Sequence, residues 1–371
     1  MDGGPASLTI GVEEEYLLVD PVSRQVSPEA DKVVAEAATE LGDRVTTEIT
    51  RYQVEIRTDP HTSLADLGDQ LRAARHAVAR AAARYGLRII SSGTPVLGQD
   101  TPVPLTPGPR YAKSAAMFRA LDEEQSACAC HVHLGVPDLT TALKLSNHLR
   151  PWLPALIALT ANSPYWAGQD TGYASWRTMT WWRWPVAGPP PHFASRTHFD
   201  DLVDGLIASG TVMDRGGLYW DIRPSHHVPT LEVRVADACP TVEDTLLLAA
   251  VLKGLATRAL EAVRQARPAP RPQPEMLRAA CWRAARDGLS GQAVNPHTGR
   301  LAPASTQLDR LLEAARPALT ATGDLPILQY GEARLRAHGN GADRQRAAHQ
   351  NGRDLNDVVD HLIRTAATPR V

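Results

Sequence analysis

Three consecutive carboxylates interrupt the first strand-like segment of the chain, where residues 11–16 read Gly-Val-Glu-Glu-Glu-Tyr. A strand alternates its faces with period two, so Glu13 and Glu15 share one face and Glu14 takes the other. Two neighbouring carboxylates on a half-buried face repel each other and lose hydration. A bound cation removes both penalties. The motif therefore predicts a metal site with Glu13 and Glu15 as ligands and with Glu14 as a structural residue.

Three further strand-like segments put aliphatic side chains on one face and acids, imidazoles or arginines on the other. The polar residues are Glu55 and Arg57, His131 and His133, and Glu232 and Arg234. Any one of these faces alone is typical of a solvated surface. Four of them in one chain, without the Lys and Thr that solvated strands usually carry, indicate a cleft. We expect a sheet with one apolar side against helices and one charged side lining that cleft.

The donor types indicate which ions and substrates such a cleft takes. Oxygen-rich ligand sets suit Mg²⁺ or Mn²⁺, and Mn²⁺ in particular tolerates one imidazole, for which His131 is the better candidate. His133 is either a site residue or a hydrogen-bonded support. Arginines beside the acids favour a phosphate or carboxylate held in a bidentate fork. A zinc site is not expected, because alternation places Cys128 and Cys130 on one face of the strand and both histidines on the other. The two cysteines are interpreted as small buried residues.

Residue chemistry alone thus predicts a divalent-metal site that handles an anionic substrate, either in phosphoryl transfer or in metal-dependent hydrolysis. The sequence contains no Walker A motif, no Gly-x-Gly-x-x-Gly after a strand, no His-Glu-x-x-His and no Gly-x-Ser-x-Gly. If ATP binds, we expect metals and arginines to hold it in place of a glycine-rich phosphate loop.

Alternating helices and strands are expected to position these residues. Apolar spacing predicts strands at 8–19, 45–50, 52–58, 87–92, 127–136, 219–223 and 230–237. It predicts helices at 28–41, 64–85, 112–122, 139–161 and 241–264, the fourth broken near its two prolines. Residues 94–109 and the tryptophan-rich 162–193 are expected to be loops. The tryptophans of the second loop either pack as ordinary core residues or form a wall or lid of the site. The proline-rich stretch 267–274 is extended and precedes a mainly helical remainder with loops near 290–303 and 338–341.

Composition narrows the class of protein. A chain of 371 residues with 43% hydrophobic and 22% charged residues is typical of a soluble globular protein. Its formal charge of −2 gives no reason to expect nucleic acid or an anionic membrane as a partner. The first residues lack the features of a signal peptide, and no apolar run approaches the roughly 20 residues of a membrane span. Four cysteines do not make a disulfide framework, so a cytoplasmic enzyme is expected.

Together the segments resemble the type 2 glutamate–cysteine ligase family of ATP-dependent carboxylate–amine ligases. The matching segments, in order over nearly the whole chain, are residues 11–16, 54–58, 130–135, 161–164, 171–177, 223–224 leading into 230–234, and 341–346. The resemblance implies one catalytic domain over residues 1–371 with an α+β, glutamine-synthetase-like fold. In that fold a curved, mostly antiparallel sheet forms a funnel and helices pack outside. The resemblance also implies ATP and Mg²⁺ as cofactors, small-molecule carboxylate and amine substrates, an acyl-phosphate intermediate, and a homodimer.

The same resemblance assigns roles to individual residues. It implies metal binding by Glu13, Glu15, Glu48, Glu55, His131 and Glu232. Arg234, Glu232 and His133 are expected to contact the nucleotide. Arg234, Glu55 and Arg177 are expected to carry catalysis, with Arg234 beside the transferred phosphate and Arg177 as an anchor for the substrate carboxylate. The expected substrates are L-glutamate, through its γ-carboxylate, and L-cysteine. A different acid–amine pair and an inactive metal-binding partner subunit remain alternatives.

Overall fold

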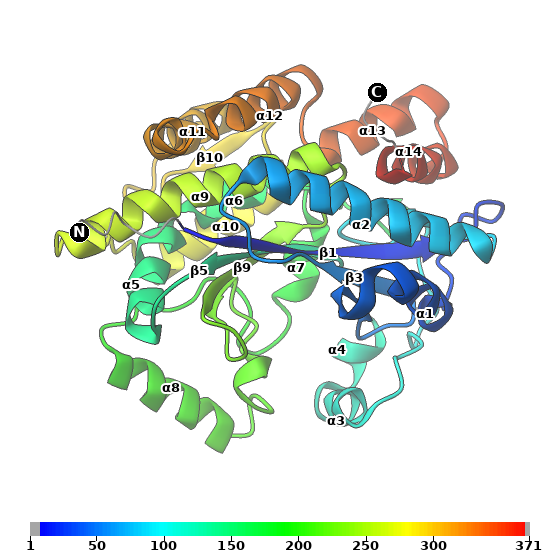
Figure 1. The fold of residues 1–371 in the computed structure, drawn as a ribbon, viewed down its shortest axis with the longest axis horizontal. Helices are drawn as coiled ribbons and strands as arrows, with labels where there is room; N and C mark the ends of the chain where they lie inside the picture. Colours follow the sequence, from blue (N-terminus) through cyan, green and yellow to red (C-terminus); the bar gives the residue numbers. More distant parts are fainter. Residues whose placement is uncertain (1–7, 368–371) are drawn as a thin grey trace.

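A seven-stranded antiparallel sheet forms the centre of the molecule in the computed structural model, which describes residues 8–367 (Figure 1). Its strands are β1 (Ile10–Val19), β2 (Val45–Thr47), β3 (Gln53–Arg57), β4 (Arg88–Ile90), β5 (Ala129–Gly135), β8 (Ile222–Pro224) and β9 (Thr230–Asp237). The strand order is β2-β3-β1-β5-β9-β8, and β4 pairs with the C-terminal end of β1. The acid-bearing strands β3, β1, β5 and β9 are therefore direct neighbours at the middle of the sheet.

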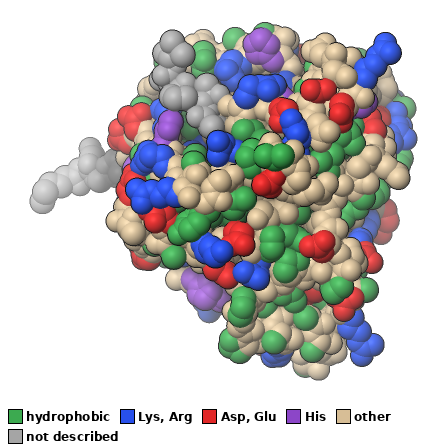
Figure 2. Space-filling view, turned by 90° about the vertical axis from the view of Figure 1, so that its right-hand side faces the viewer, with side chains coloured by type: hydrophobic (Ala, Val, Ile, Leu, Met, Phe, Trp, Pro, Cys, Tyr) green, Lys and Arg blue, Asp and Glu red, His purple; other side chains and the backbone are tan. Residues whose placement is uncertain are grey.

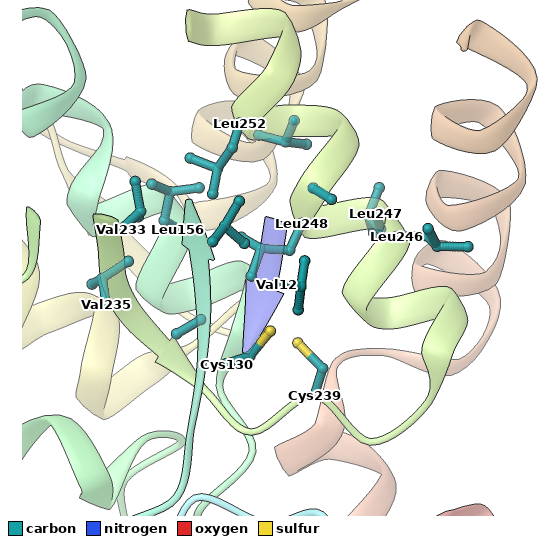
Figure 3. Packing of buried hydrophobic residues seen from close by; sticks show 14 of the residues in the cluster. Val12, Cys130, Leu156, Val233, Val235, Cys239, Leu246, Leu247, Leu248 and Leu252 are labelled. Atoms are coloured by element: carbon teal, nitrogen blue, oxygen red, sulfur yellow. The ribbon is translucent and has the colours of Figure 1, made fainter. Parts of the chain in front are cut away.

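One face of this sheet is apolar, as strand alternation predicts. Val12, Ile56, Val132 and Val233 are buried in a single hydrophobic cluster. Figure 3 shows this face packed against leucines of helix α9 (Val242–Arg264). Burial of each such side chain contributes about 1.5–3 kcal/mol to stability. The opposite face is left for the polar residues.

Helices cover the apolar face in a layer. These are α2 (Leu64–Arg84), α6 (Leu153–Thr160), α9, α10 (Pro274–Asp287), α11 (Ala304–Thr322) and α12 (Leu325–His338), most of which lie above the sheet in Figure 1. Helix α9 is apolar on nearly all sides because α2, α11 and α12 pack around it. It begins with a capping box between Thr241 and Asp244. Helices before and after the proline-rich stretch 267–274 contribute to the same hydrophobic cluster.

The remaining elements surround these two layers. They are α1 (Ala30–Leu41), α3 (Pro109–Phe118), α4 (Ala120–Glu123), α5 (Leu139–Leu149), α7 (Trp176–Trp181), α8 (Arg196–Ala208), α13 (Gly341–Gly352), α14 (Leu355–Ala367) and the small hairpins β6–β7 (165–170) and β10–β11 (292–303). In Figure 1 helices α3, α4 and α8 lie below the sheet, on the side opposite to α9. These helices and their connections flank the polar face.

Several sequence predictions need correction. The helix predicted at 112–122 begins at Pro109 and is broken at Arg119, whose φ of 52° lies in the left-handed region. The loops predicted at 162–193 and 290–303 contain α7 and two hairpins, too short for periodicity to detect. The strand predicted at 219–223 is displaced to Ile222–Pro224, and α8 was not predicted at all.

Figure 2 shows basic, acidic and hydrophobic residues interspersed over one face. Among the described residues, no helix has the length and apolar character needed to cross a membrane.

Candidate active site

A cleft of about 930 Å³ lies on the polar face of the sheet. Its floor is made by side chains of β1, β3, β5, β8 and β9, and its walls come from α3, α4, α7 and the loops around them. The predicted residues that line it are Glu13, Glu15, Glu48, Glu55, His131, His133, Glu232 and Arg234. Of the predicted site residues, Arg177 alone is not part of this lining.

Strand register brings the acidic residues together. Glu15 of β1 stands directly opposite Glu55 of β3, and Glu13 stands opposite His131 of β5. Glu15, Glu55 and His131 can each offer one ligand atom, with these atoms all within 4.8 Å of one another. Glu13, His131 and Glu232 form a second such group. Like charges opposite each other destabilise a sheet, so this register favours a structure with cations bound.

A β-bulge interrupts the pairing of β5 with β9 next to Arg234. Cys130 pairs with Ala236 and Val132 pairs with Val233, so β9 has two residues, Arg234 and Val235, where β5 has only His131. A bulge bends its strand and redirects side chains next to it. The backbone N–H of Arg234 donates to the carbonyl of Asp221 (2.8 Å), outside the β5–β9 ladder. Glu232 and Arg234, two residues apart on β9, both line the cleft.

Two of the glutamates have positively charged or proton-donating partners within the protein. Glu13 contacts Nδ1 of His131 (3.1 Å) and Nε2 of His133 (3.3 Å), whereas Glu232 pairs with Arg234 and with Nε of Arg223 (2.8 Å). Burial acts to raise the pKa of both carboxyls. The histidines and arginines outweigh burial, and the pKa of each glutamate lies below its usual range.

The other three glutamates have no charged side chain of opposite sign as a partner. Within residues 8–367 no arginine or lysine forms an ion pair with Glu15, Glu48 or Glu55. Burial raises the pKa of Glu15 to about 8, and the Glu48 charge adds to this. Burial, followed by the charges of Glu13 and Glu48, raises the pKa of Glu55 well above its usual range. The pKa of Glu48 is also raised by burial. This half of the cluster has an excess of negative charge that a metal ion would neutralise.

His131 has the form that a metal ligand needs. Burial and the nearby Arg234 lower its pKa to about 4, so its ring is neutral near pH 7. Its Nε2 is buried without a hydrogen-bond partner among the described residues and lies 3.9 Å from Glu15. A neutral ring nitrogen and the two carboxylates of Glu15 and Glu55 are a donor set suited to a divalent cation.

Glu48, His133 and Arg177 occupy positions around this centre. Glu48 contacts the carboxyl of Glu55 and accepts from the N–H of Ile49 (3.0 Å). His133 shares its Nδ1 with the hydroxyl of Thr230 (2.9 Å) while Nε2 faces Glu13. Arg177 is buried on α7, where Nη2 donates to the carbonyl of Arg234 (3.2 Å). This geometry supports the backbone of Arg234, and the role of Arg177 as a substrate anchor stays a prediction.

Residues interpreted as structural have that role in the fold. Glu14 accepts hydrogen bonds from Nε (2.8 Å) and Nη2 (2.6 Å) of the buried Arg75, and also from the hydroxyls of Tyr16 and Thr245. Cys128 and Cys130 are free and buried. The sulfur atoms of Cys130 and Cys239 point toward each other in the core (Figure 3). Both interpretations from the sequence are confirmed.

Several lining residues were missed from the sequence. They are Arg110, Tyr111, Asp122, Gln125, Tyr219 and Arg223. Most stand in short or irregular segments, where no periodicity assigns a face to a side chain. Arg223 is the exception, because it alternates with Ile222 in a strand and pairs in register with Glu232. Trp181 and Trp184 of the tryptophan-rich segment do line the cleft, as the interpretation of that segment as a wall predicts.

Comparison with solved structures defines the fold. A crystal structure of glutamate–cysteine ligase from Francisella tularensis in complex with AMP covers 99% of this chain and 89% of its own, with a TM-score of 0.71 at 12% identity. A bifunctional glutathione synthetase from Pasteurella multocida covers 97% of this chain and 51% of its own, with a TM-score of 0.68 at 14% identity. The protein therefore has the α+β, glutamine-synthetase-like fold that the resemblance implies.

Sequence comparison then gives the family. The model of the glutamate–cysteine ligase family 2 matches residues 9–361. A relative from Saccharopolyspora erythraea is 47% identical over 358 residues, covering 96% of this chain and 94% of its own. Another from Nocardia farcinica is 45% identical, covering 95% and 92%. Both are named provisionally as glutamate–cysteine ligase 2-1. The chain belongs to this family and is an ATP-dependent carboxylate–amine ligase.

Proposed function

We propose that the protein joins the γ-carboxylate of L-glutamate to the amine of L-cysteine through an acyl phosphate, releasing ADP and phosphate. The observation that carries the proposal is the unequal charge in the glutamate cluster. Glu15, Glu48 and Glu55 have no arginine or lysine partner within residues 8–367, whereas two arginines flank Glu232. A site that needs cations beside a site that offers guanidinium groups suits a metal–nucleotide complex.

The donor sets fit divalent cations. Glu15, Glu55 and His131 form one predicted set, Glu13, His131 and Glu232 form the other, and Glu48 supports the first through Glu55. Mg²⁺ is favoured because most donors are carboxylate oxygens, and Mn²⁺ is the alternative because an imidazole is shared. When bound, such ions offset charge on the β- and γ-phosphates of ATP.

The arginines provide fixed positive charge where phosphoryl transfer takes place. A carboxylate is a poor electrophile, so it must accept a phosphoryl group before an amine can attack it. Arg234 is held between Glu232 and the ring of Trp181, with its guanidinium carbon 5.8 Å from the ring centroid. We expect Arg234 to neutralise charge on the transferred group, and Glu232 and His133 to contact the nucleotide side of the cleft.

Aromatic side chains protect the intermediate. Trp181, Trp184 and Tyr219 form one wall of the cleft, with ring centroids 5.1–6.4 Å apart. Water destroys an acyl phosphate, and an apolar wall both limits its access and strengthens electrostatic interactions nearby. These three rings carry no group specific for a thiol, so a different acid–amine pair is the second candidate. We also retain a homodimer as part of the proposal.

ADP release and product formation test the function directly. With ATP and Mg²⁺, we expect ADP release that depends on both a carboxylate and an amine, with L-glutamate and L-cysteine giving γ-glutamylcysteine by mass spectrometry. A panel of other amino acids and primary amines distinguishes the second candidate. If no acid–amine pair stimulates ADP release, both substrate proposals are wrong.

A further inference from the structure

Asp122 on α4 is a carboxylate of the cleft wall that the reaction described above does not use. It is 1% exposed and lines the same cleft as the glutamates. Ser114 and Trp184 lie beside it, but among the described residues no donor reaches either carboxylate oxygen in good hydrogen-bond geometry. It forms no ion pair within residues 8–367. A buried carboxylate without a charged partner is unfavourable, so its presence indicates that a ligand supplies the missing positive charge.

Aromatic rings stand beside this carboxylate. The centroid of Trp184 lies 6.4 Å from that of Tyr219 and 5.5 Å from that of Trp181. Phe118, at the end of α3, packs against both Trp184 and Tyr219 at 6.4 Å. Ring faces attract cations and also bury apolar groups. A carboxylate next to several aromatic rings is a combination that recognises an ammonium ion carrying an apolar substituent.

The rings connect this carboxylate to the arginine side of the cleft. Trp181 contacts Arg234 on one side and packs against Tyr219 at 5.1 Å on the other. The charge of Asp122 in turn acts on the pKa of Tyr219, which burial raises. The aromatic wall therefore has a cation at one end, suited to anionic groups, and an anion at the other.

We propose that Asp122, with Trp181, Trp184 and Tyr219, forms the subsite that receives the amine substrate as its ammonium ion, with the apolar substituent against the rings. The inference rests on the proposed ligase function and adds a specificity-determining residue to it. Asp122 selects substrates that arrive with a positive charge and disfavours neutral molecules of the same shape.

The test compares a charged amine with a nucleophile that does not need the carboxylate. Hydroxylamine is neutral at pH 7 and converts an acyl phosphate into a hydroxamate. In Asp122→Asn we expect the KM for L-cysteine, or for the best amine of the panel, to rise on the order of 10- to 100-fold. Hydroxamate formation from L-glutamate, ATP and hydroxylamine is expected to stay within about twofold of the wild type, because a neutral nucleophile does not need the charge of Asp122.

Two controls separate this role from a structural one. Glu123→Gln removes an exposed carboxylate from the next position of α4 and is expected to leave every rate unchanged. The melting temperature of Asp122→Asn is expected to equal or exceed that of the wild type, because a buried unpaired charge is lost. In the wild type, benzylamine, charged at pH 7, should inhibit competitively against the amine, and benzyl alcohol at least about tenfold less.

The outcomes are distinguishable. If the wild type forms neither hydroxamate nor amide with any acid of the panel, the proposed function is wrong and the subsite is wrong with it. If the wild type is active but Asp122→Asn keeps its KM for the amine, or loses amide and hydroxamate formation equally, the subsite is wrong and the ligase function stands. Equal inhibition by benzylamine and benzyl alcohol also overturns the subsite, whether or not the variant folds.

Discussion

At the scale of single residues, the five glutamates of the cleft fall into two groups according to whether a charged or histidine side chain is paired with them. Glu13 and Glu232 have histidine or arginine partners, and their pKa values are lowered despite burial. Glu15, Glu48 and Glu55 have raised pKa values because burial and mutual repulsion act together. The second group costs stability, which indicates a functional purpose for placing these carboxylates side by side.

Glu55 gives the clearest single-residue prediction. Glu55→Gln keeps the shape of the side chain but removes a predicted metal ligand, so we expect kcat to fall by at least about 100-fold. The free energy of unfolding, measured in urea, should stay the same or rise, because one of the repelling charges is gone. Glu40→Gln, on the exposed surface of α1, is the matched control. Near-normal turnover in Glu55→Gln would show that the metal assignment is wrong.

How far the sequence predicts the site also depends on individual residues. Glu13, Glu15, Glu55, His131 and Glu232 stand in strands, where period-two alternation with aliphatic residues places each on the polar face of its own strand. The sequence did not reveal the bulge opposite His131, because a bulge depends on the register between two strands. It also did not reveal Asp122, which follows the break at Arg119 in a segment without periodicity.

At the scale of elements, β1 is held to two helices by one buried polar group. Glu14 of β1 bonds Arg75 of α2 and Thr245 of α9, all within the hydrophobic layer. Arg75 also donates to the carbonyls of Pro240 (3.0 Å) and Cys239 (2.9 Å). This network fixes the position of β1 relative to α2 and α9. It thereby positions Glu13 and Glu15, which lie on the opposite face of β1.

Breaking that network should destabilise the fold. In Glu14→Ala the buried guanidinium of Arg75 is left unpaired, and we expect the free energy of unfolding to fall by about 3–5 kcal/mol. Urea denaturation measures this loss. Glu40→Ala, which removes an exposed partner of Arg80, should cost less than about 1 kcal/mol. If the free energy of unfolding of Glu14→Ala fell by no more than that of Glu40→Ala, the network would not hold β1 in place.

Helix α7 positions the arginines through one aromatic ring. The guanidinium carbons of Arg177 and Arg234 each lie 5.8 Å from the centroid of Trp181, whose Nε1 donates to the carbonyl of Tyr219 (3.2 Å). Each cation–π contact contributes about 0.5–2 kcal/mol. The predicted loop at 162–193 did not reveal this helix, because its six residues are fewer than two full turns.

Trp181→Leu tests this arrangement. With Arg234 less constrained, we expect kcat/KM for ATP to fall roughly 2- to 30-fold, following the range of cation–π energies, with the fold retained by circular dichroism. Trp282→Leu, a tryptophan of α10 with 38% exposure, serves as the control. An unchanged kcat/KM for ATP in Trp181→Leu would show that the Trp181 ring does not position Arg234.

At the scale of the whole molecule, the acid cluster links stability to pH and to metal. A carboxyl with a raised pKa binds its proton more tightly in the folded state than in the unfolded state. Its destabilising effect is therefore absent below the unfolded pKa of about 4.5 and complete above the folded pKa, which is about 8 for Glu15. The lowered pKa values of Glu13 and Glu232 change stability only below about pH 4.5, outside this window.

We expect the melting temperature of the protein treated with EDTA to fall by several degrees between about pH 6.5 and pH 8, because below pH 6.5 the lowered pKa of His131 acts in the opposite direction. Added Mg²⁺ should raise it, and more strongly at pH 8 than at pH 5, because protons no longer compete for the glutamates. Differential scanning calorimetry across this range, with Ca²⁺-free buffers, checks both statements. A melting temperature that rises with pH in EDTA would contradict the assignment of Glu15 and Glu55.

Much of the architecture follows from the sequence, but not all. The strands around the site and the helices α2 and α9 have strong periodicity and are confirmed within a few residues. The sheet order is not readable, since the pairing of β1 with β5 joins segments more than a hundred residues apart. Helix α8 and the two small hairpins lie outside the main core, where short amphipathic segments leave only weak patterns.

The division between a regular floor and irregular walls has a consequence for how this enzyme changes over time. The residues expected to handle ATP stand on neighbouring strands, and a substitution there alters the shared reaction. The residues proposed to choose the amine stand on α4, α7 and their connections, where a substitution leaves the strand register intact. New nucleophiles are thus accessible through mutations on α4 that preserve phosphoryl transfer, whereas Trp181 of α7 also contacts Arg234. Exchanging residues 109–127 with those of a relative should change the part of the amine preference that depends on Asp122, while ATP turnover is retained.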